Sequence, residues 1–151
     1  MPATLEVETM RPADPEPARS DSSAAPLARA PAITWFEIPA LGYEATVAFY
    51  DALLGAPLQR VQDPEMGAYA KFDGPEDGTQ GCVARARDHK PSADGTVVYL
   101  WCGLDLDPVL KRATNLGARI AAPKCILPHG IGAVAQIVDP EGNRVGLHAR
   151  R

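Results

Sequence analysis

The segment "ITWFEIPALGYEATVAFYDALLG" (residues 33–55) decides the fold prediction because its periodicity changes part-way along. Its first part, "ITWFEIP" (33–39), is a β-branched and aromatic run of strand length. In "LGYEATVAFYDALLG" (41–55), Val47, Tyr50 and Leu54 recur at the spacing of one helix face, and Gly55 stands where a helix C-cap is expected. The segment therefore predicts a strand followed by a helix.

The remainder of the first half predicts three short strands separated by turns. The runs are "PLQRVQ" (57–62), "AYAKFD" (68–73) and "TQGCVARA" (79–86), and the clusters between them, "DPEMG" and "DGPEDG", are rich in turn-forming residues. The first half is thus a βαβββ unit.

The second half repeats this order. "TVVYLWC" (96–102) is a strand, and "DLDPVLKRATNLG" (105–117) is a helix with Asp107 as its N-cap, Pro108 at its first position and Gly117 after its end. Three strands follow, "ARIAAP" (118–123), "GAVAQIVD" (132–139) and "RVGLHA" (144–149). One sequence offset pairs Val47 with Leu110 and Trp35 with Val98, which indicates a duplicated α+β domain; a chance pairing is the alternative.

Length and charge limit the classes of partner. A chain of 151 residues that is 46% hydrophobic suits one ordinary domain. A net charge of −4 and a pI near 5.3 argue against nucleic acid and acidic membranes as partners. No apolar run approaches the roughly eighteen residues of a membrane span, so we expect no membrane association.

Residues 1–31 differ in composition from the rest and predict a disordered, Pro- and Ala-rich tail before a domain at 32–150. The tail lacks the basic start and apolar stretch of a signal peptide, which favours a cytoplasmic location. Three cysteines, Cys82, Cys102 and Cys125, form no CxxC pair and are odd in number. We expect reduced thiols in small apolar sites.

A family resemblance rests on "WFEIPALGYEATVAFYDALLG" (35–55), the second helix and the closing "DPEGNRVGLHA" (139–149). In combination they resemble the vicinal oxygen chelate superfamily of glyoxalases, bleomycin-resistance proteins and extradiol dioxygenases, from Ile33 to about Arg150. The resemblance implies two βαβββ modules, at about 32–88 and 95–150, that form a cup-shaped curved mixed sheet with helices on the outside. It also implies a homodimer, because cups in this superfamily are often completed across two chains. It is greatest to small glyoxalase-like proteins of unassigned substrate, and fold likeness names no substrate.

The resemblance also indicates where metal-dependent members carry their ligands. The equivalent positions here are Trp35, Gly81, Val98 and Gly146, none of which supplies a donor group. We therefore expect no metal and no other cofactor. Gly146, in the middle of the last strand, would stand where a metal-binding relative has glutamate and would leave room in the cup.

Side-chain alternation predicts which residues line a small-molecule pocket in the cup. Phe36 and Ile38 point toward the helices, and Tyr99 and Trp101 pack under the second helix. His129 lies in a glycine-bearing loop that either covers the cup or is a surface loop. The predicted pocket residues are Trp35, Glu37, Arg85, Val98, Leu100, Cys102, His129, Arg144, Gly146 and His148.

Three candidate residues have structural alternatives. Glu37 suits a salt bridge or a subunit interface as well as a catalytic base. Cys102 suits core packing. His148 suits a satisfied or solvent-facing histidine more than an acid–base group.

Three functions remain. The favoured one is a metal-independent small-molecule-binding protein of the glyoxalase-like type, which sequesters its ligand or acts on it by acid–base chemistry. The second is a metal-dependent lyase or dioxygenase whose ligands lie in a different register from the four positions above. A replacement metal site would have to be assembled from Glu37, Cys102 and His148. The third is a non-catalytic interaction domain. Whether the chain is an enzyme stays open at this point.

Overall fold

The computed structural model describes residues 33–65, 67–74 and 78–151, all within one compact unit, Pro31–Arg151. The predicted tail, residues 1–31, lies outside the described residues. Among the described residues, no helix is long and apolar enough to cross a membrane.

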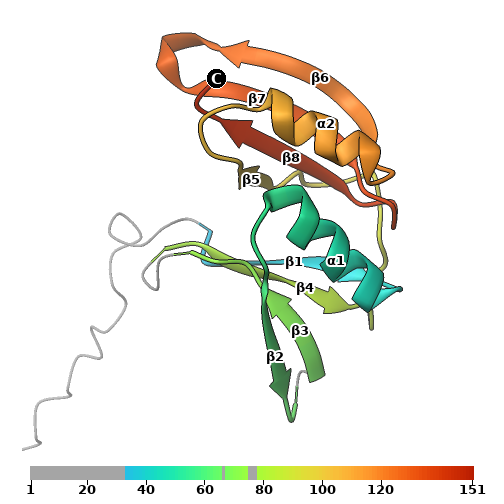
Figure 1. Cartoon of the computed structure of the whole chain (residues 1–151). Helices are drawn as coiled ribbons and strands as arrows, with labels where there is room; N and C mark the ends of the chain where they lie inside the picture. The colour runs from blue at the N-terminus through green and yellow to red at the C-terminus, as the bar shows by residue number, and fades with distance from the viewer. Residues whose placement is uncertain (1–32, 66, 75–77) are drawn as a thin grey trace, which may run out of the picture. The chain divides into compact units, whose positions relative to one another are not determined.

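The first module has the predicted order of one strand, one helix and three strands (Figure 1). Its elements are β1 (Trp35–Ala40), α1 (Tyr43–Leu54), β2 (Gln59–Asp63), β3 (Gly67–Lys71) and β4 (Gln80–Arg85). They form sheet 1, in the order β1-β4-β3-β2, with β1 parallel to β4 and the other neighbours antiparallel.

The second module repeats this arrangement. Its elements are β5 (Tyr99–Trp101), α2 (Asp107–Asn115), β6 (Arg119–Leu127), the 3₁₀ turn η2 (Pro128–Gly130), β7 (Gly132–Val138) and β8 (Arg144–Ala149). They form sheet 2, in the order β5-β8-β7-β6, with β5 parallel to β8. The duplicated α+β architecture predicted from the sequence is confirmed, as two four-stranded mixed sheets.

Helix α1 ends where its glycine predicts. Gly55 adopts a left-handed φ of 71°, and its backbone N–H donates to the Asp51 carbonyl at 2.9 Å. Tyr43, Val47, Tyr50 and Leu53 form the buried face of the helix. That face packs on sheet 1, and Figure 1 shows α1 lying obliquely across β1 and β4.

The predicted N-cap of α2 is wrong by one residue. Asp107 is already the first helical residue, Leu106 occupies the cap position, and the Asp107 N–H donates to the Asp105 carboxylate at 3.1 Å. Leu106 is completely buried and its backbone already has helical dihedral angles, so the helix begins one residue earlier than predicted. Gly117 follows the helix with a φ of 92°.

The "DPEGN" turn joins the two modules. Asp139, only 4% exposed, accepts a hydrogen bond from the Tyr50 hydroxyl at 2.8 Å and another from the Asn143 amide at 3.0 Å. The Asn143 amide also donates to the Pro39 carbonyl. The Glu141 carboxylate accepts from the backbone N–H groups of Leu41 (2.7 Å) and Gly42 (3.1 Å), immediately before α1. A turn of the second module thus caps the helix of the first.

A second link joins the helices. Arg112 of α2 donates from Nε to the Leu53 carbonyl at 3.0 Å, so a cation lies at the negative end of α1. One hydrophobic cluster contains buried residues of both modules, including Tyr50, Val83, Leu100 and Leu147. The described part of the chain therefore has a single shared core.

Candidate functional site

Each sheet has one face covered by its helix and one open face. On β1, Ile38 is 4% exposed and faces α1, whereas Trp35 is 39% exposed and points the other way with Glu37. The prediction that Trp35 and Glu37 share a face opposite the helix is consistent with this burial pattern.

The predicted orientation of β4 is wrong. Phe36, not Trp35, pairs with Gly81, so Gly81, Val83 and Arg85 lie on the α1 side of the sheet. The Arg85 guanidinium lies 5.0 Å from the centre of the Tyr43 ring, at the start of α1. The physical reason is that the Phe36 ring lies across Gly81, where a Cβ would collide with it.

The predicted orientation of β5 is also wrong, because the residues predicted to face the helix and those predicted to face the cup are exchanged. Tyr99 pairs with Gly146 and Trp101 with His148 on the open face of sheet 2, where Tyr99 is 43% and Trp101 58% exposed. Leu100, predicted to line the cup, is 6% exposed and belongs to the core.

Val98 and Cys102 lie just outside β5, at its two ends. The Val98 carbonyl accepts from the Gly146 N–H at 2.8 Å. The Cys102 thiol donates to the Leu100 carbonyl at 3.4 Å.

The space that Gly146 leaves is filled by the Tyr99 side chain of the same chain. A Cβ there would collide with the Tyr99 ring, which crosses the glycine as Phe36 crosses Gly81 in the first module. The Tyr99 hydroxyl also accepts a hydrogen bond from the Gln136 amide at 2.7 Å. The bare glycine is thus explained by an aromatic ring that packs on it.

The remaining predicted site residues are dispersed. His148 lies with its ring centre 5.2 Å from that of Trp101 and donates from Nε2 to the Ile131 carbonyl at 2.9 Å. His129, in η2, is exposed with a left-handed φ of 59°. Arg144 is exposed at the start of β8.

The open face of sheet 1 holds the best-defined polar cluster, which consists of Trp35, Glu37, Tyr69 and His89. The Trp35 indole N–H donates to Glu37 Oε1 at 3.2 Å, and His89 Nε2 lies 3.8 Å from Glu37 Oε2. The rings of Trp35 and Tyr69 meet edge to face with centres 6.4 Å apart. We call these four residues the Glu37 cluster.

Two hollows border Glu37. One, of about 260 Å³, is lined by Tyr69, His89 and the arginines Arg85 and Arg87. The other, of about 180 Å³, is lined by Val98 and Arg144 among others. Arg85, the last residue of β4, thus borders the first hollow although its guanidinium packs on Tyr43 on the α1 side, and Val98 and Arg144 border the second.

His89 was missed by the sequence analysis. It follows β4 in a loop without regular structure, where neither periodicity nor a motif marks it. The parallel pairing of β1 with β4 is the signal that points to it, because the loop after β4 then starts beside the end of β1.

Burial controls the chemistry of two thiols. Burial, with the nearby Glu37 carboxylate, raises the pKa of Cys82 from 9.0 to about 12. Burial raises the pKa of Cys102 to about 11, despite a backbone hydrogen bond with His148 and the charge of Arg112, which lower it. Both thiols therefore stay protonated at neutral pH and are poor nucleophiles. All three cysteines are free, and Cys125 is exposed, contrary to the predicted apolar site.

Comparison with solved structures identifies the fold. A member of the glyoxalase/bleomycin resistance protein/dioxygenase superfamily from Sphaerobacter thermophilus matches with a TM-score of 0.57 and 25% identity, over 78% of this chain and 95% of its own. The chain has the vicinal oxygen chelate fold. The resemblance drawn from the sequence is thereby confirmed at the level of the fold.

Two further solved structures share the vicinal oxygen chelate fold with this chain. A glyoxalase I mutant from Zea mays is 20% identical with a TM-score of 0.57, over 78% of this chain and 45% of its own. TnmS3, an antibiotic binding protein from a Streptomyces species, is 20% identical with a TM-score of 0.55, over 78% of this chain and 93% of its own. No protein-family model matches the chain, and no curated protein matches it.

The donor groups do not fit a resident divalent metal of the kind that metal-dependent proteins with this fold hold. Within residues 33–65, 67–74 and 78–151, no three His, Cys, Asp or Glu side chains come together as ligands. Glu37 and His89 supply a pair, whereas a divalent site commonly needs three donors. Cys102, the next candidate ligand, lies beyond the end of β5 in the second module, where its thiol donates to the Leu100 carbonyl.

Proposed function

We propose that this chain binds a small organic molecule on the open face of sheet 1, without a divalent metal, and that the Glu37 cluster contacts the ligand. The observation that carries the proposal is the convergence of an indole, a phenol, a carboxylate and an imidazole on one uncovered sheet face. Aromatic walls with a few placed polar groups are typical of small-molecule sites.

The cluster favours a ligand with a flat apolar part and a hydrogen-bond donor. The rings of Trp35 and Tyr69 offer stacking surface, and the Glu37 carboxylate offers an acceptor. The side chains of Glu37 and His89 are 33% and 49% exposed, so both are accessible to a ligand. The Glu37 and His89 side chains lie 3.8 Å apart, too far for a hydrogen bond between them, so each can form a hydrogen bond with a bound molecule.

A homodimer is part of the proposal. Trp35, Tyr99 and Trp101 expose large rings on the two open faces, and exposed apolar patches mark interaction surfaces. A two-fold axis that places the open face of sheet 1 against the partner's sheet 2 would cover both faces and close the pocket.

The test is a thermal-shift screen of metabolites and antibiotics, because a molecule that binds only the folded state must raise the melting temperature. Binding of an antibiotic would parallel what TnmS3 is described as doing. We expect hits whose stabilisation is lost in Glu37→Gln and retained in Glu44→Gln, a matched substitution at an exposed position on α1. Equal stabilisation of both variants would place the ligand elsewhere and contradict the proposal.

Mass spectrometry of the ligand after incubation separates sequestering from catalysis. We expect the molecule to be recovered unchanged if the chain only sequesters it. A changed ligand, formed by wild type and not by His89→Ala, would assign proton transfer to the Glu37–His89 pair.

A further inference from the structure

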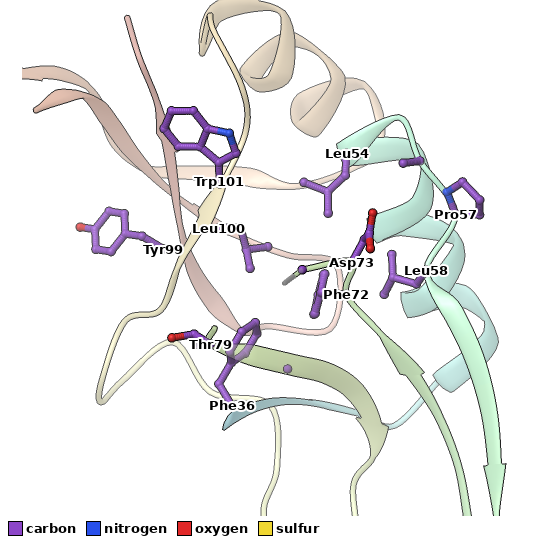
Figure 2. A pocket seen from close by; sticks show the side chains of 13 residues that line it. Phe36, Leu54, Pro57, Leu58, Phe72, Asp73, Thr79, Tyr99, Leu100 and Trp101 are labelled. Atoms are coloured by element: carbon purple, nitrogen blue, oxygen red, sulfur yellow. The ribbon is translucent and has the colours of Figure 1, made fainter. Parts of the chain in front are cut away.

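Another hollow in the described part of the chain lies apart from the Glu37 cluster. It has a volume of about 390 Å³ and lies between the end of α1, the end of β3 and β5 (Figure 2). Its lining includes Phe36 and Gly81, which belong to the α1 side of sheet 1. Because Trp35 and Glu37 point to the other side of the same strands, the sheet separates the two sites.

The walls of this hollow are mainly apolar. Leu58, Phe72 and Leu100 are each less than 9% exposed, so the hollow reaches into the core. Phe36 stacks on Phe72 with ring centres 5.5 Å apart, which fixes an aromatic surface along one side. The volume lies within the range of pockets that hold drug-sized molecules.

Asp73 gives the hollow its charge. It is the only charged residue among the described lining residues, and it makes no hydrogen bond or ion pair with any residue that the structure describes. Figure 2 shows its carboxylate on the same side of the hollow as Leu54 and Leu58. The lining hydroxyls are already engaged, because Thr79 donates to the Ile33 carbonyl and Tyr99 accepts from Gln136. A carboxylate beside an apolar hollow selects for a cation.

We propose that this hollow is a second binding site, for a small hydrophobic amine whose apolar body fills the hollow and whose ammonium group pairs with Asp73. The site goes beyond the proposed function, since it uses neither Glu37 nor the open face of sheet 1. Asp73 is exposed at the rim of the hollow, so its carboxylate is open to an incoming ammonium group, and an ionised acceptor makes a stronger hydrogen bond than a neutral one.

Three matched probes test the site by isothermal titration calorimetry, namely phenylbutylamine, phenylbutanol and phenylbutanoate. They share one apolar body and differ in charge, so the amine is expected to bind about threefold to fivefold more tightly than the alcohol, as for an exposed ion pair. The carboxylate is expected to bind most weakly. Equal affinity for all three, or no saturable binding of the amine, would overturn the proposal.

Substitutions inside and outside the hollow show where the amine binds. Asp73→Asn is expected to bring the amine down to the affinity of the alcohol, whereas Glu44→Gln removes the same charge elsewhere and leaves the preference intact. Ala56→Trp fills the hollow from an exposed lining position and is expected to abolish binding of both probes. A circular dichroism melt checks that each variant is folded. Full amine binding by Ala56→Trp would overturn the proposal. Glu37→Gln is expected to bind the amine as wild type does, which distinguishes this hollow from the proposed ligand site on the open face of sheet 1.

Discussion

At the scale of single residues, two glycines decide which face each strand presents. Gly81 and Gly146 each lie under an aromatic ring of the neighbouring parallel strand, Phe36 and Tyr99 respectively. The ring covers backbone that a glycine leaves bare, and it fixes the side-chain order along the pair. A glycine inside a strand therefore marks a packing site here.

Replacement of Gly146 by alanine tests this packing. The added Cβ collides with the Tyr99 ring, so Gly146→Ala is expected to destabilise the fold by about 1–3 kcal/mol. The cost should fall in a Tyr99→Ala background, where no ring is present. Urea denaturation of wild type, the two single variants and the double variant measures this cost as a change in the free energy of unfolding. An equal cost in both backgrounds would contradict the role of the ring.

The cysteines give a pH prediction. The folded-state pKa values of Cys82 (about 12) and Cys102 (about 11) lie above the ordinary value of 9.0, so these groups contribute stability that is fully present below about pH 9 and is lost as the pH rises through 11 to 12. At pH 7 to 9, we expect maleimide to label the exposed Cys125 first. Mass spectrometry after limited labelling checks the order, and early labelling of Cys82 would contradict it.

At the scale of elements, the order of strands and helices could be predicted but their register could not. Strand–helix periodicity and glycine caps marked both modules, and Gly55 ends α1 as expected. In contrast, "VVYLWC" (97–102) is apolar or aromatic at every position, so alternation alone does not say which face is buried. A slip of one residue reverses every side chain, and Tyr99, Trp101 and Leu100 were therefore assigned to the wrong faces.

The role of Glu141 also lay beyond the sequence. "DPEGN" predicts a turn, but the contact of its glutamate with the start of α1 joins segments far apart in the chain. Such a contact depends on how the two modules pack. The same holds for His89, which reaches Glu37 from a loop.

Loss of the Glu141 carboxylate is expected to weaken α1. Glu141→Ala leaves the N–H groups of Leu41 and Gly42 without their acceptor, which should cost about 0.5–2 kcal/mol, as for the loss of an N-cap. Thermal denaturation measures the change against Glu44→Ala, which removes a carboxylate from the first turn of the same helix. An equal, small effect of both substitutions would mean that the cap contributes little.

At the scale of the whole molecule, the two modules share one core and leave two open faces. The buried Tyr50–Asp139–Asn143 network and the Arg112–Leu53 contact hold the modules together. The exposed rings of Trp35, Tyr99 and Trp101 lie on the open faces of the two sheets. The proposed ligand site and the proposed dimer contact therefore use the same surfaces.

The dimer proposal predicts the mass of the molecule in solution. Wild type is expected to scatter light as a dimer at micromolar concentration, and Trp101→Glu is expected to scatter as a monomer because it places a charge in the apolar contact. Leu104→Glu is a control, since Leu104 is also exposed but lies outside both sheets. A wild-type monomer at every concentration would contradict the dimer.

The measurement that tests the central claim most directly is a fluorescence titration of a screening hit against the Trp101→Phe variant. The chain has two tryptophans, so this variant reports on Trp35 alone. The account predicts a saturable change in Trp35 emission, and an affinity about tenfold weaker once Glu37→Gln is added, because a hydrogen bond to a charged group is lost. An unchanged Trp35 emission on binding, or an affinity that Glu37→Gln does not alter, would contradict a ligand site on the open face of sheet 1.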